Sequence, residues 1–429
     1  MKQKIKMISY LQYIYKTYIN RQMLVLMALG FSSGFPFLLV FGTLSFWLKE
    51  IDISLKLIGI FSLVKLPYSL KWLWSPLIDN IKLPVLNKLG RRRSWAVLIQ
   101  IMLFISIVLM SITDPQKHTL CMALFALLTC FLSASQDIVL DAFRVESFTD
   151  YPEKQASGVA IYVLGYRLGL IFSGAGAIYL ASIMNWSHVY IIMACGIFVG
   201  LSAILYTSEP QKYTYTKYKF EIKDSIKFLK NSIIKPFNDF MSHRYWGWII
   251  VLIFTYHLSN AYFNPMMFPF YIDMGFSKTE IAYVLKIYGM IAAIIGGLSG
   301  GIIVMKIGLK KSMIYFGILQ CLSTLLFSLQ AAYGHNIPLF IIIVTVENFC
   351  SGLATTALVA YISSLCNKLY TATQYAILSS FMSISRDVFS STSGFVAEHV
   401  SWEMFFVISA LMSLPSILII LLCMRQERN

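Results

Sequence analysis

Charged side chains inside long apolar segments are the residues of this sequence best placed to do chemistry. A charge at the centre of a bilayer costs about 2.5–3.5 kcal/mol on insertion scales, so each one needs a partner or a water-filled cavity. Five cations are nearly balanced by four acids, which favours pairing within a central polar cavity over exposure to lipid. These residues are Lys65, Lys71, Arg167, Lys286 and Arg386, with Asp137, Asp141, Glu347 and Asp387.

Two of the arginines occupy matching places in the sequence. Arg167 follows Gln155 by twelve residues, and Arg386 follows Gln374 by twelve. Arg167 lies about eleven residues, or roughly 17 Å, into its apolar segment, which is close to the middle of a bilayer. A guanidinium presents paired donors that match a carboxylate. The two arginines therefore predict an anionic substrate; the alternative is that each only neutralises a neighbouring acid.

The segment ASQDIVLDAFR places Asp137, Asp141 and Arg144 at i, i+4 and i+7, on one face of a helix. We interpret Asp141 and Arg144 as a gate. Its expected partners lie around the turn between the second and third predicted spans: Asp79, Arg91, Arg92 and Arg93.

Asp137 and Glu347 are the predicted proton-coupling residues. Asp137 lies one helical turn deeper than Asp141, and Glu347 lies about ten residues into its apolar segment. Burial favours the neutral form of a carboxyl, so either group could bind and release a proton during a cycle. A static ion pair between helices is an equally good reading of either residue.

Aromatic residues accompany these charges. Tyr162 and Tyr166 lie beside Arg167 near mid-membrane and are candidates for lining a cavity. Trp72 and Trp74 lie close to the end of a segment, where aromatic belts are usual.

No catalytic or cofactor motif competes with this picture. Residues 30–34 match G-x-S-x-G, but that nucleophile motif needs a strand–turn–helix context, and here it lies within an apolar helix. The same residues match G-x-x-x-G, which packs helices closely in lipid. Walker A, HExxH, CxxC and EF-hand patterns are absent from the sequence, so we predict no enzyme activity, no metal and no cofactor.

The elements that position these residues are membrane helices. The 429-residue chain is 58% apolar and 13% charged, against roughly 45–50% and 25% in soluble domains. Twelve apolar segments are each long enough to cross a hydrocarbon core of about 30 Å. The sequence thus predicts an all-α integral membrane protein with twelve spans, at 23–47, 56–78, 95–113, 119–142, 156–182, 187–207, 245–272, 279–304, 312–333, 337–365, 374–397 and 402–424.

The formal charge of +15 would fit nucleic-acid binding, but its distribution argues against it. With a cytoplasmic N-terminus, most of the 35 Lys and Arg fall on cytoplasmic segments, as the positive-inside rule requires. The exceptions outside the spans are Lys49, Lys56, Lys117 and Lys278. We predict no nucleic-acid partner, contact with membrane lipid, and both termini in the cytoplasm.

The predicted spans divide into two bundles around one long basic connection. Ile222, Ile226, Leu229, Ile233, Phe237 and Phe240 recur in it at helical spacing, which fits a helix on the membrane surface; a solvated linker broken at Pro236 fits as well. The predicted domains are a cytoplasmic segment at 1–22, six-helix bundles at 23–207 and 245–424, the linker at 208–244, and a tail at 425–429.

Landmarks in the two bundles are separated by offsets that agree to within one residue. Gln155 and Gln374 are 219 residues apart, and the turns Gly90-Arg91-Arg92-Arg93 and Gly308-Leu309-Lys310-Lys311 are 218 apart. Two repeated six-helix halves with such turns resemble the major facilitator superfamily, whose substrate site lies between the halves near the midplane. Met305 stands where the second turn would carry an acid, so we expect the stronger gate in the first half.

Several stretches resemble the AmpG family of bacterial muropeptide permeases. They are LGFSSGFPFLLVFGTLSFWL, SLVKLPYSLKWLWSPLIDN, SASQDIVLDAFR and CNKLYTATQYAILSS. The resemblance covers nearly all twelve spans. It implies proton-driven import of N-acetylglucosaminyl-anhydro-N-acetylmuramyl peptides across the inner membrane. It also implies functional roles for Gly34, Ala134, Gln136, Asp137 and Gln374.

The sequence as a whole predicts a monomeric, proton-coupled transporter of an anionic glycopeptide. Its predicted substrate-binding residues are Gly34, Ala134, Gln136, Tyr162, Arg167, Gln374 and Arg386. Distant relatives that move acetyl-CoA share the pattern, so another anionic cargo such as an acyl-CoA or a nucleotide is an alternative. A membrane sensor on the same fold, which binds without transporting, is a second one.

Overall fold

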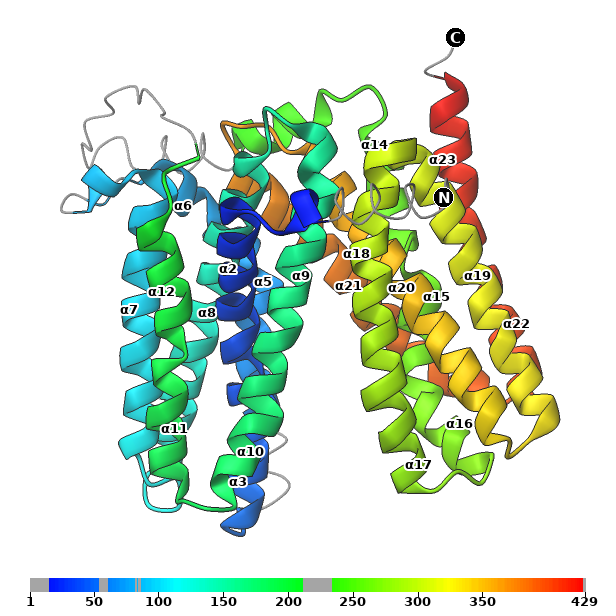
Figure 1. The fold of residues 1–429 in the computed structure, drawn as a ribbon, viewed down its shortest axis with the longest axis horizontal. Coiled ribbons are helices and arrows are strands. Elements are labelled where there is room, and N and C mark those ends of the chain that lie inside the picture. Colours follow the sequence, from blue (N-terminus) through cyan, green and yellow to red (C-terminus); the bar gives the residue numbers. More distant parts are fainter. Residues whose placement is uncertain (1–14, 54–60, 82, 84–85, 211–233, 427–429) are drawn as a thin grey trace, which may run out of the picture. The chain divides into compact units, whose positions relative to one another are not determined.

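The computed structural model describes residues 15–53, 61–81, 83, 86–210 and 234–426, and these residues form helices and connecting turns with no β-strand (Figure 1). Within the described residues, each of the twelve predicted spans coincides with helical structure, which confirms the all-helical class. Nine helices in the described ranges are long and apolar enough to cross a membrane. The predicted surface helix falls mainly on residues 211–233, outside the described residues. Residues 234–241 are helical through Pro236.

The described chain divides into two compact units. The first comprises residues 1–150, 161–237 and 366–376; the second comprises 151–160, 238–365 and 377–429. Two of the divisions fall inside α9 (Gln155–Ile171) and α21 (Thr371–Ala397), so each of these helices contributes residues to both units.

The first unit is a bundle in which α2, α7, α8 and α12 pack on one another. Helix α2 begins at Arg21 and is capped by Asn20, whose side chain accepts a hydrogen bond from the Met23 N–H and so satisfies an orphan donor of the first turn. The elements of this unit, with η marking 3₁₀ or π segments, are α2 (Arg21–Leu38), η1 (Leu39–Thr43), α3 (Leu44–Glu50), η2 (Ser62–Lys65), α5 (Leu66–Leu70), η3 (Lys71–Leu73), α6 (Ser75–Asn80), η4 (Asn87–Leu89), α7 (Arg91–Ile112), α8 (Thr119–Ser147), η6 (Phe172–Gly176), α10 (Ala177–Ala181), α11 (Trp186–Cys195) and α12 (Ile197–Tyr206).

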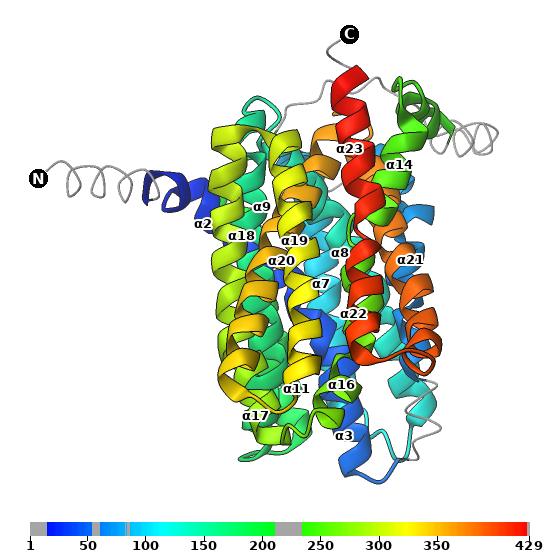
Figure 2. The ribbon, with the colours of Figure 1, turned by 90° about the vertical axis from the view of Figure 1, so that its right-hand side faces the viewer.

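The second unit is built around α20, which packs against α18 and α19, while α22 packs on α19 (Figure 2). Its elements, besides the greater part of α21, are η5 (Pro152–Lys154), α14 (Trp246–Thr255), α15 (Leu258–Phe263), η8 (Asn264–Met266), α16 (Met267–Asp273), α17 (Lys278–Tyr283), η9 (Val284–Gly289), α18 (Met290–Ile307), α19 (Leu309–Tyr333), α20 (Ile337–Leu365), α22 (Trp402–Leu411) and α23 (Leu414–Gln426).

Four predicted spans are interrupted rather than continuous. Those at 187–207 and 402–424 each have one break, at Gly196 and at Met412–Ser413, and the other two have more than one. The segment predicted at 56–78 consists, from Ser62 onward, of four short helical pieces, with prolines at 67 and 76 near the starts of α5 and α6. The segment predicted at 245–272 breaks at Tyr256–His257 and again at the 3₁₀ turn that contains Pro265. Proline lacks an N–H and cannot continue the helical hydrogen-bond ladder, which accounts for three of these interruptions.

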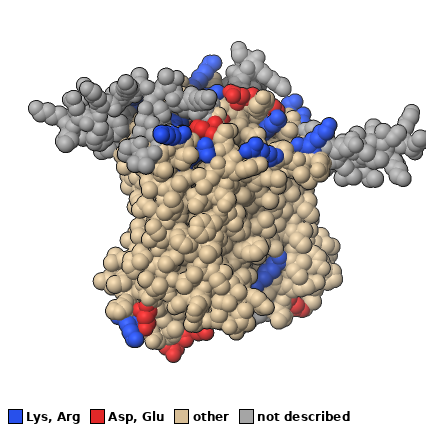
Figure 3. Space-filling model, turned by 60° about the vertical axis from the view of Figure 1, so that its left-hand side comes forward, with Lys and Arg blue, Asp and Glu red and all other residues tan. Residues whose placement is uncertain are grey.

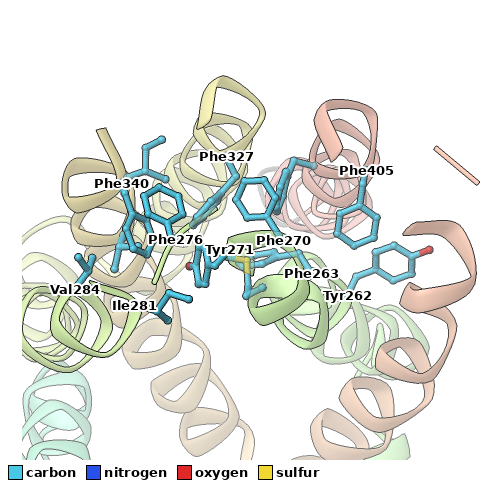
Figure 4. Packing of buried hydrophobic residues seen from close by; sticks show 14 residues of the cluster. Tyr262, Phe263, Phe270, Tyr271, Phe276, Ile281, Val284, Phe327, Phe340 and Phe405 are labelled. Atoms are coloured by element: carbon cyan, nitrogen blue, oxygen red, sulfur yellow. The ribbon is translucent and has the colours of Figure 1, made fainter. Parts of the chain in front are cut away.

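Aromatic rings form the core of the second unit at one end of its helices (Figure 4). Phe270 of α16 contacts Phe406 of α22 with ring centroids 4.8 Å apart, and Phe406 stacks on Phe327 of α19 at 5.2 Å. Because lipid tails are as apolar as these rings, close packing rather than escape from water holds such helices together.

The same local structure recurs in the two halves of the sequence. Helices α8 and α20 each have 29 residues, and both their first and their last residues are 218 positions apart. Gly90 and Gly308, at the starts of α7 and α19, both have positive φ, at 103° and 85°. This conformation is open to glycine and strained for other residues. The repeat inferred from the sequence is therefore present in the backbone.

Charged side chains follow the membrane pattern on the face drawn in Figure 3. Uncharged residues cover the middle of the helices there, and most charged residues lie toward the two ends.

Candidate functional site

A buried ion cluster joins the ends of α6, α7 and α8 in the first unit. Arg92 Nη2 lies 2.7 Å from Asp79 Oδ1 and 2.7 Å from Glu146 Oε1, and Arg91 Nη2 lies 2.7 Å from the same Glu146 oxygen. The side chains of all four residues are at most 5% exposed. Two cations and two acids leave the cluster without net charge, as burial requires.

The start of α21 closes this cluster. The second Asp79 oxygen, Oδ2, accepts hydrogen bonds from the backbone N–H of Thr373 at 2.8 Å and from its hydroxyl at 2.7 Å. The first N–H groups of a helix have no partner within the helix and carry partial positive charge. Asp79 thus caps α21 with a carboxylate that Arg92 holds in place.

Arg93 has a different set of partners from Arg91 and Arg92. Its guanidinium donates to the carbonyl oxygens of Ile204 and Leu205 at the end of α12, at 2.9 and 3.0 Å. Glu209, just beyond α12, accepts from the backbone N–H groups of Arg92 and Arg93. Burial raises the pKa of the Glu209 carboxyl, and these two hydrogen bonds oppose the shift.

Asp141 and Arg144 form a pair of their own. Arg144 Nη2 lies 3.3 Å from Asp141 Oδ1, and its guanidinium carbon lies 5.5 Å from the Tyr162 ring centroid and 5.3 Å from that of Tyr375. Contacts of a guanidinium with ring faces stabilise a buried cation. The six predicted gating residues therefore lie in three settings, and the α8 acid that pairs with Arg91 and Arg92 is Glu146 rather than Asp141.

The middle of α8 carries a polar stretch that faces neighbouring elements. Ser33 Oγ donates to Asp137 Oδ1 at 2.6 Å, and Gln136 Nε2 donates to the backbone oxygen of Ser32 at 2.7 Å. Ala134 and Gln136 are fully buried. The structure thus places Gln136 in the contact between α8 and α2.

Two aromatic side chains of the interrupted segment 62–80 donate hydrogen bonds to serines in the same polar stretch of α8. Tyr68 Oη donates to Ser133 Oγ at 2.7 Å, and Trp74 Nε1 donates to Ser135 Oγ at 3.0 Å. Trp74 is therefore anchored to α8, although its position in the sequence suggested an interfacial belt.

Gly34 lies where α2 and α9 touch backbone to backbone. A Cβ at Gly34 would overlap the carbonyl oxygen of Tyr166, and one at Gly30 would overlap that of Tyr162. From the other helix, a Cβ at Gly169 would overlap the carbonyl of Phe31. Gly34 thus acts through helix packing.

The remaining predicted residues of the first unit are partly or fully buried. Gln374 Nε2 donates to the Pro236 carbonyl at 3.1 Å, and its Oε1 accepts from the Asn367 N–H at 2.6 Å. These bonds order the segment before α21. Arg167 is partly exposed and has interaction partners within the protein.

A cavity of about 450 Å³ lies within the second unit, beside the break between α14 and α15. Its polar lining comes mainly from His257, Asn260, Asn264, Ser351, Thr355 and Arg386. Among the described side chains that line it there is one arginine and no acid. The cavity volume falls in the range of about 300–1,000 Å³ usual for ligand sites.

Glu347 lies apart from this lining. It is 7% exposed on α20, and Gln320 Nε2 of α19 donates to its Oε1 at 3.4 Å. Across the described residues, no group of three His, Cys, Asp or Glu side chains is arranged to hold a metal ion.

Several residues of these sites escaped the sequence analysis. Glu146 lies two residues past Arg144 and so off the helix face that the i, i+4, i+7 pattern defined. The sequence analysis selected Lys, Arg, Asp and Glu side chains within apolar segments, and it therefore did not select His257, Asn260 and Asn264. Their signal was a cluster of polar residues beside Pro265 inside an apolar span.

Comparison with known proteins identifies the family. A family model described as Major Facilitator Superfamily matches residues 249–429, and one described as Acetyl-coenzyme A transporter 1 matches residues 22–194. AmpG 4 of Rickettsia felis is 35% identical, with 95% of this chain and 98% of the relative covered. The chain belongs to the AmpG family.

Another relative supports this family, and two solved structures share the fold. The anhydromuropeptide permease of Escherichia coli K12 is also 35% identical, over 93% of this chain and 79% of the relative. The proton:xylose symporter XylE superposes with a TM-score of 0.68 at 11% identity, covering 94% of this chain and 95% of XylE. Human MFSD10, an organic anion transporter, superposes with a TM-score of 0.64 at 13% identity, covering 94% of this chain and 99% of MFSD10. This AmpG-family protein therefore has the major facilitator fold, is a multi-pass membrane protein, and is a transporter rather than an enzyme.

Proposed function

We propose that this protein imports anionic muropeptides, N-acetylglucosaminyl-anhydro-N-acetylmuramyl peptides, across a bacterial inner membrane with protons as the coupling ion. The observation that carries the proposal is the 35% identity to an anhydromuropeptide permease over 93% of this chain. The cavity that contains Arg386 and no acid among its described lining supports an anionic cargo. Both termini lie in the cytoplasm in this proposal, and the protein works as a monomer.

The cargo's negative charge is held by Arg386 in the second unit and by Arg167 in the first. Arginine binds carboxylates through two parallel hydrogen bonds, and a site poor in water strengthens them. Gln136 and Gly34 act as positioning residues, because both hold α2 against its neighbours. Gln374 and Ala134 are also positioning residues. Gln374 holds the segment before α21 in place, and Ala134 acts within α8.

The buried ion cluster forms the cytoplasmic gate. Asp79 binds the start of α21 in one state of the cycle, and release of that helix start accompanies the change to the other. The Asp141–Arg144 pair steadies the adjoining turn of α8 beside Tyr162.

Asp137 or Glu347 carries the proton. Asp137 accepts a hydrogen bond from Ser33 Oγ and Glu347 accepts one from Gln320 Nε2, and both donors are neutral. A neutral donor can bond to either the protonated or the ionised acid. An experiment can tell the two acids apart. A carboxyl that serves only proton coupling is needed for uptake driven by the pH gradient, but not for exchange of external cargo for internal cargo.

Uptake by vesicles tests the proposal. Proteoliposomes with the purified chain should accumulate a radiolabelled disaccharide tripeptide when the outside is acidified, and a protonophore should abolish accumulation. Arg386→Ala should remove uptake, whereas Asp150→Asn, at an exposed site, should leave it unchanged. Stoichiometric binding without accumulation would indicate a sensor and overturn the transport proposal; uptake that survives the protonophore would overturn proton coupling.

Asp137→Asn and Glu347→Gln distinguish the proton sites. The variant at the coupling acid should lose accumulation driven by the pH gradient and retain exchange of external labelled cargo for internal unlabelled cargo. Loss of exchange in both variants would assign both acids to structure or to cargo binding.

A second candidate cargo is acetyl-CoA or another anionic metabolite, because the acetyl-coenzyme A transporter model matches residues 22–194. Competition decides between them: excess acetyl-CoA should not slow muropeptide uptake if the first proposal holds.

A further inference from the structure

Lys71 is a buried cation that the proposed function does not use. It lies on η3, in the middle of the interrupted segment 62–80, and is 9% exposed. Within the described part of the chain it forms no hydrogen bond and no ion pair. An ammonium group inside a membrane span loses most of its hydration, so it needs a negative charge nearby.

Two hydrogen bonds hold the backbone around Lys71 against α8. Tyr68, three residues before it, donates to Ser133 Oγ at 2.7 Å, and Trp74, three residues after it, donates to Ser135 Oγ at 3.0 Å. The η3 segment between these two anchors also packs on α8. Lys71 is therefore fixed beside the polar stretch in the middle of α8.

Asp137 is the acid of that polar stretch, and it attracts Lys71 electrostatically. Its carboxylate accepts a hydrogen bond from the neutral Ser33 hydroxyl at 2.6 Å. The two opposite charges thus face each other across a gap, without direct contact. Attraction between charges weakens with their separation, so Asp137 can still change its protonation state. A direct buried ion pair would hold the acid in its ionised form, because breaking such a pair is costly.

The other titratable groups near Asp137 leave Lys71 as the group placed to balance its charge. They are Asp141 of α8, Tyr68 of α5, Tyr162 of α9 and Tyr375 of α21. Asp141 is already paired with Arg144 at 3.3 Å. Tyrosine side chains ordinarily ionise only near pH 10, so the three phenols are neutral at physiological pH.

We propose that Lys71 is the counter-charge of Asp137 and that Asp137, rather than Glu347, carries the coupling proton. The inference rests on the proposed function and adds the residue that makes the proton leave. A nearby ammonium group favours the ionised carboxyl. Asp137 therefore takes a proton from the more acidic side of the membrane and gives it up to water on the less acidic side. Lys71 acts through Asp137 and is a positioning residue.

Infrared spectroscopy of the full chain in lipid vesicles measures the protonation of Asp137. The C=O stretching band that Asp137→Asn removes belongs to this carboxyl, and its amplitude is followed as the pH is varied. In Lys71→Gln the midpoint of that titration should rise by about one pH unit or more, because the positive charge that favoured ionisation is gone. Lys71→Arg keeps the charge and should keep the midpoint close to that of the wild type.

Lys65→Gln is the matched control. Lys65 is an exposed lysine of the same interrupted segment, and its ammonium group lies over the Phe41 ring at 5.1 Å from the centroid. Its loss should leave the midpoint of Asp137 unchanged. The same shift in Lys65→Gln as in Lys71→Gln would overturn the proposal, because it would indicate a general effect of positive charge.

Transport of the disaccharide tripeptide gives a second measurement. With a vesicle interior near neutral pH, Lys71→Gln should retain its proton, lose accumulation driven by the pH gradient, and keep exchange of external for internal cargo. Raising the internal and external pH together by the measured shift should restore accumulation. A structural defect would not be repaired in this way.

Thermal unfolding covers the case in which Lys71→Gln does not fold. Asp137→Asn leaves Lys71 without its counter-charge, so adding Lys71→Gln to that variant should raise its unfolding temperature. A double variant no more stable than Asp137→Asn would contradict the pairing of the two residues.

The remaining outcomes separate this inference from the proposed function. An unchanged midpoint in Lys71→Gln, in a chain whose wild type transports cargo, would overturn the role of Lys71 alone. The absence of any band that Asp137→Asn removes would also overturn it, because Asp137 would then not titrate. Driven accumulation that survives Asp137→Asn and is lost in Glu347→Gln would overturn the assignment of the proton. If the wild type moves no muropeptide, the proposed function fails, while the infrared midpoints still decide whether Lys71 and Asp137 form a pair.

Discussion

Replacing Asp79 by asparagine isolates the charge at the centre of the buried ion cluster. The asparagine has the same shape but only one acceptor oxygen, so it cannot serve both Arg92 and Thr373. It also leaves two buried cations with Glu146 as the acid of the cluster. Breaking a buried pair costs about 3–5 kcal/mol, and a hydrogen bond to a charged group is worth about 1.5–3 kcal/mol. We therefore expect a loss of about 3 kcal/mol.

Hydrogen exchange of residues 366–376 measures that loss where it arises. Asp79 accepts the N–H of Thr373, so a loss of about 3 kcal/mol should speed exchange of that amide about a hundredfold. Asp150→Asn is the matched control. Asp150 pairs with Lys368 of the same segment at 3.2 Å, but at 78% exposure such a pair is worth about 0–1 kcal/mol. Equal exchange in the two variants would refute the view that the buried cluster holds the start of α21.

Three further substitutions test other contacts. Gly34→Leu should prevent close packing of α2 on α9 and lower the thermal unfolding temperature in detergent. The control Gly247→Leu should leave that temperature unchanged, because nothing lies within 4 Å of a Cβ at Gly247. Equal effects of the two substitutions would reject the packing role of Gly34. Phe406→Ala should cost about 3–5 kcal/mol and the 71%-exposed Phe395→Ala much less, a difference that denaturant titration checks. The raised pKa of Glu209 means that its contribution to stability is present below the ordinary value of about 4.3 and is lost as the pH rises through the raised native value. Glu209→Gln should therefore flatten the fall of stability between the ordinary value of about 4.3 and the raised native pKa, and an unchanged profile would rule the residue out.

The architecture was predictable where it depends on hydropathy and repetition. Helices α8 and α20 are long and apolar, so their existence follows from length and composition, and their common offset of 218 follows from the turns at Gly90 and Gly308. The breaks around His257 were not predicted. Hydropathy records the cost of moving side chains into lipid and carries no information on which backbone groups find partners inside the bundle.

The site was predictable where a charge stands out against lipid. Arg386 could be singled out because a charge in an apolar span is costly, and it lines the cavity. Glu146 could not be assigned, because its role depends on which face of α8 meets α7. Asn260 escaped for a different reason: a neutral amide is cheap enough in a span to need no functional explanation.

The glycine contact between α2 and α9 has a mechanical consequence. The backbones of α2 and α9 touch without intervening side chains at these glycines, so no change of rotamer can let the helices slide past each other. The two helices should therefore move together as a rigid pair. Ser33 lies between Gly30 and Gly34 on α2, and its hydroxyl is bonded to Asp137. A tilt of α2 relative to α8 would move the Ser33 hydroxyl away from Asp137, and the Asp137 carboxyl would then lose this hydrogen-bond donor.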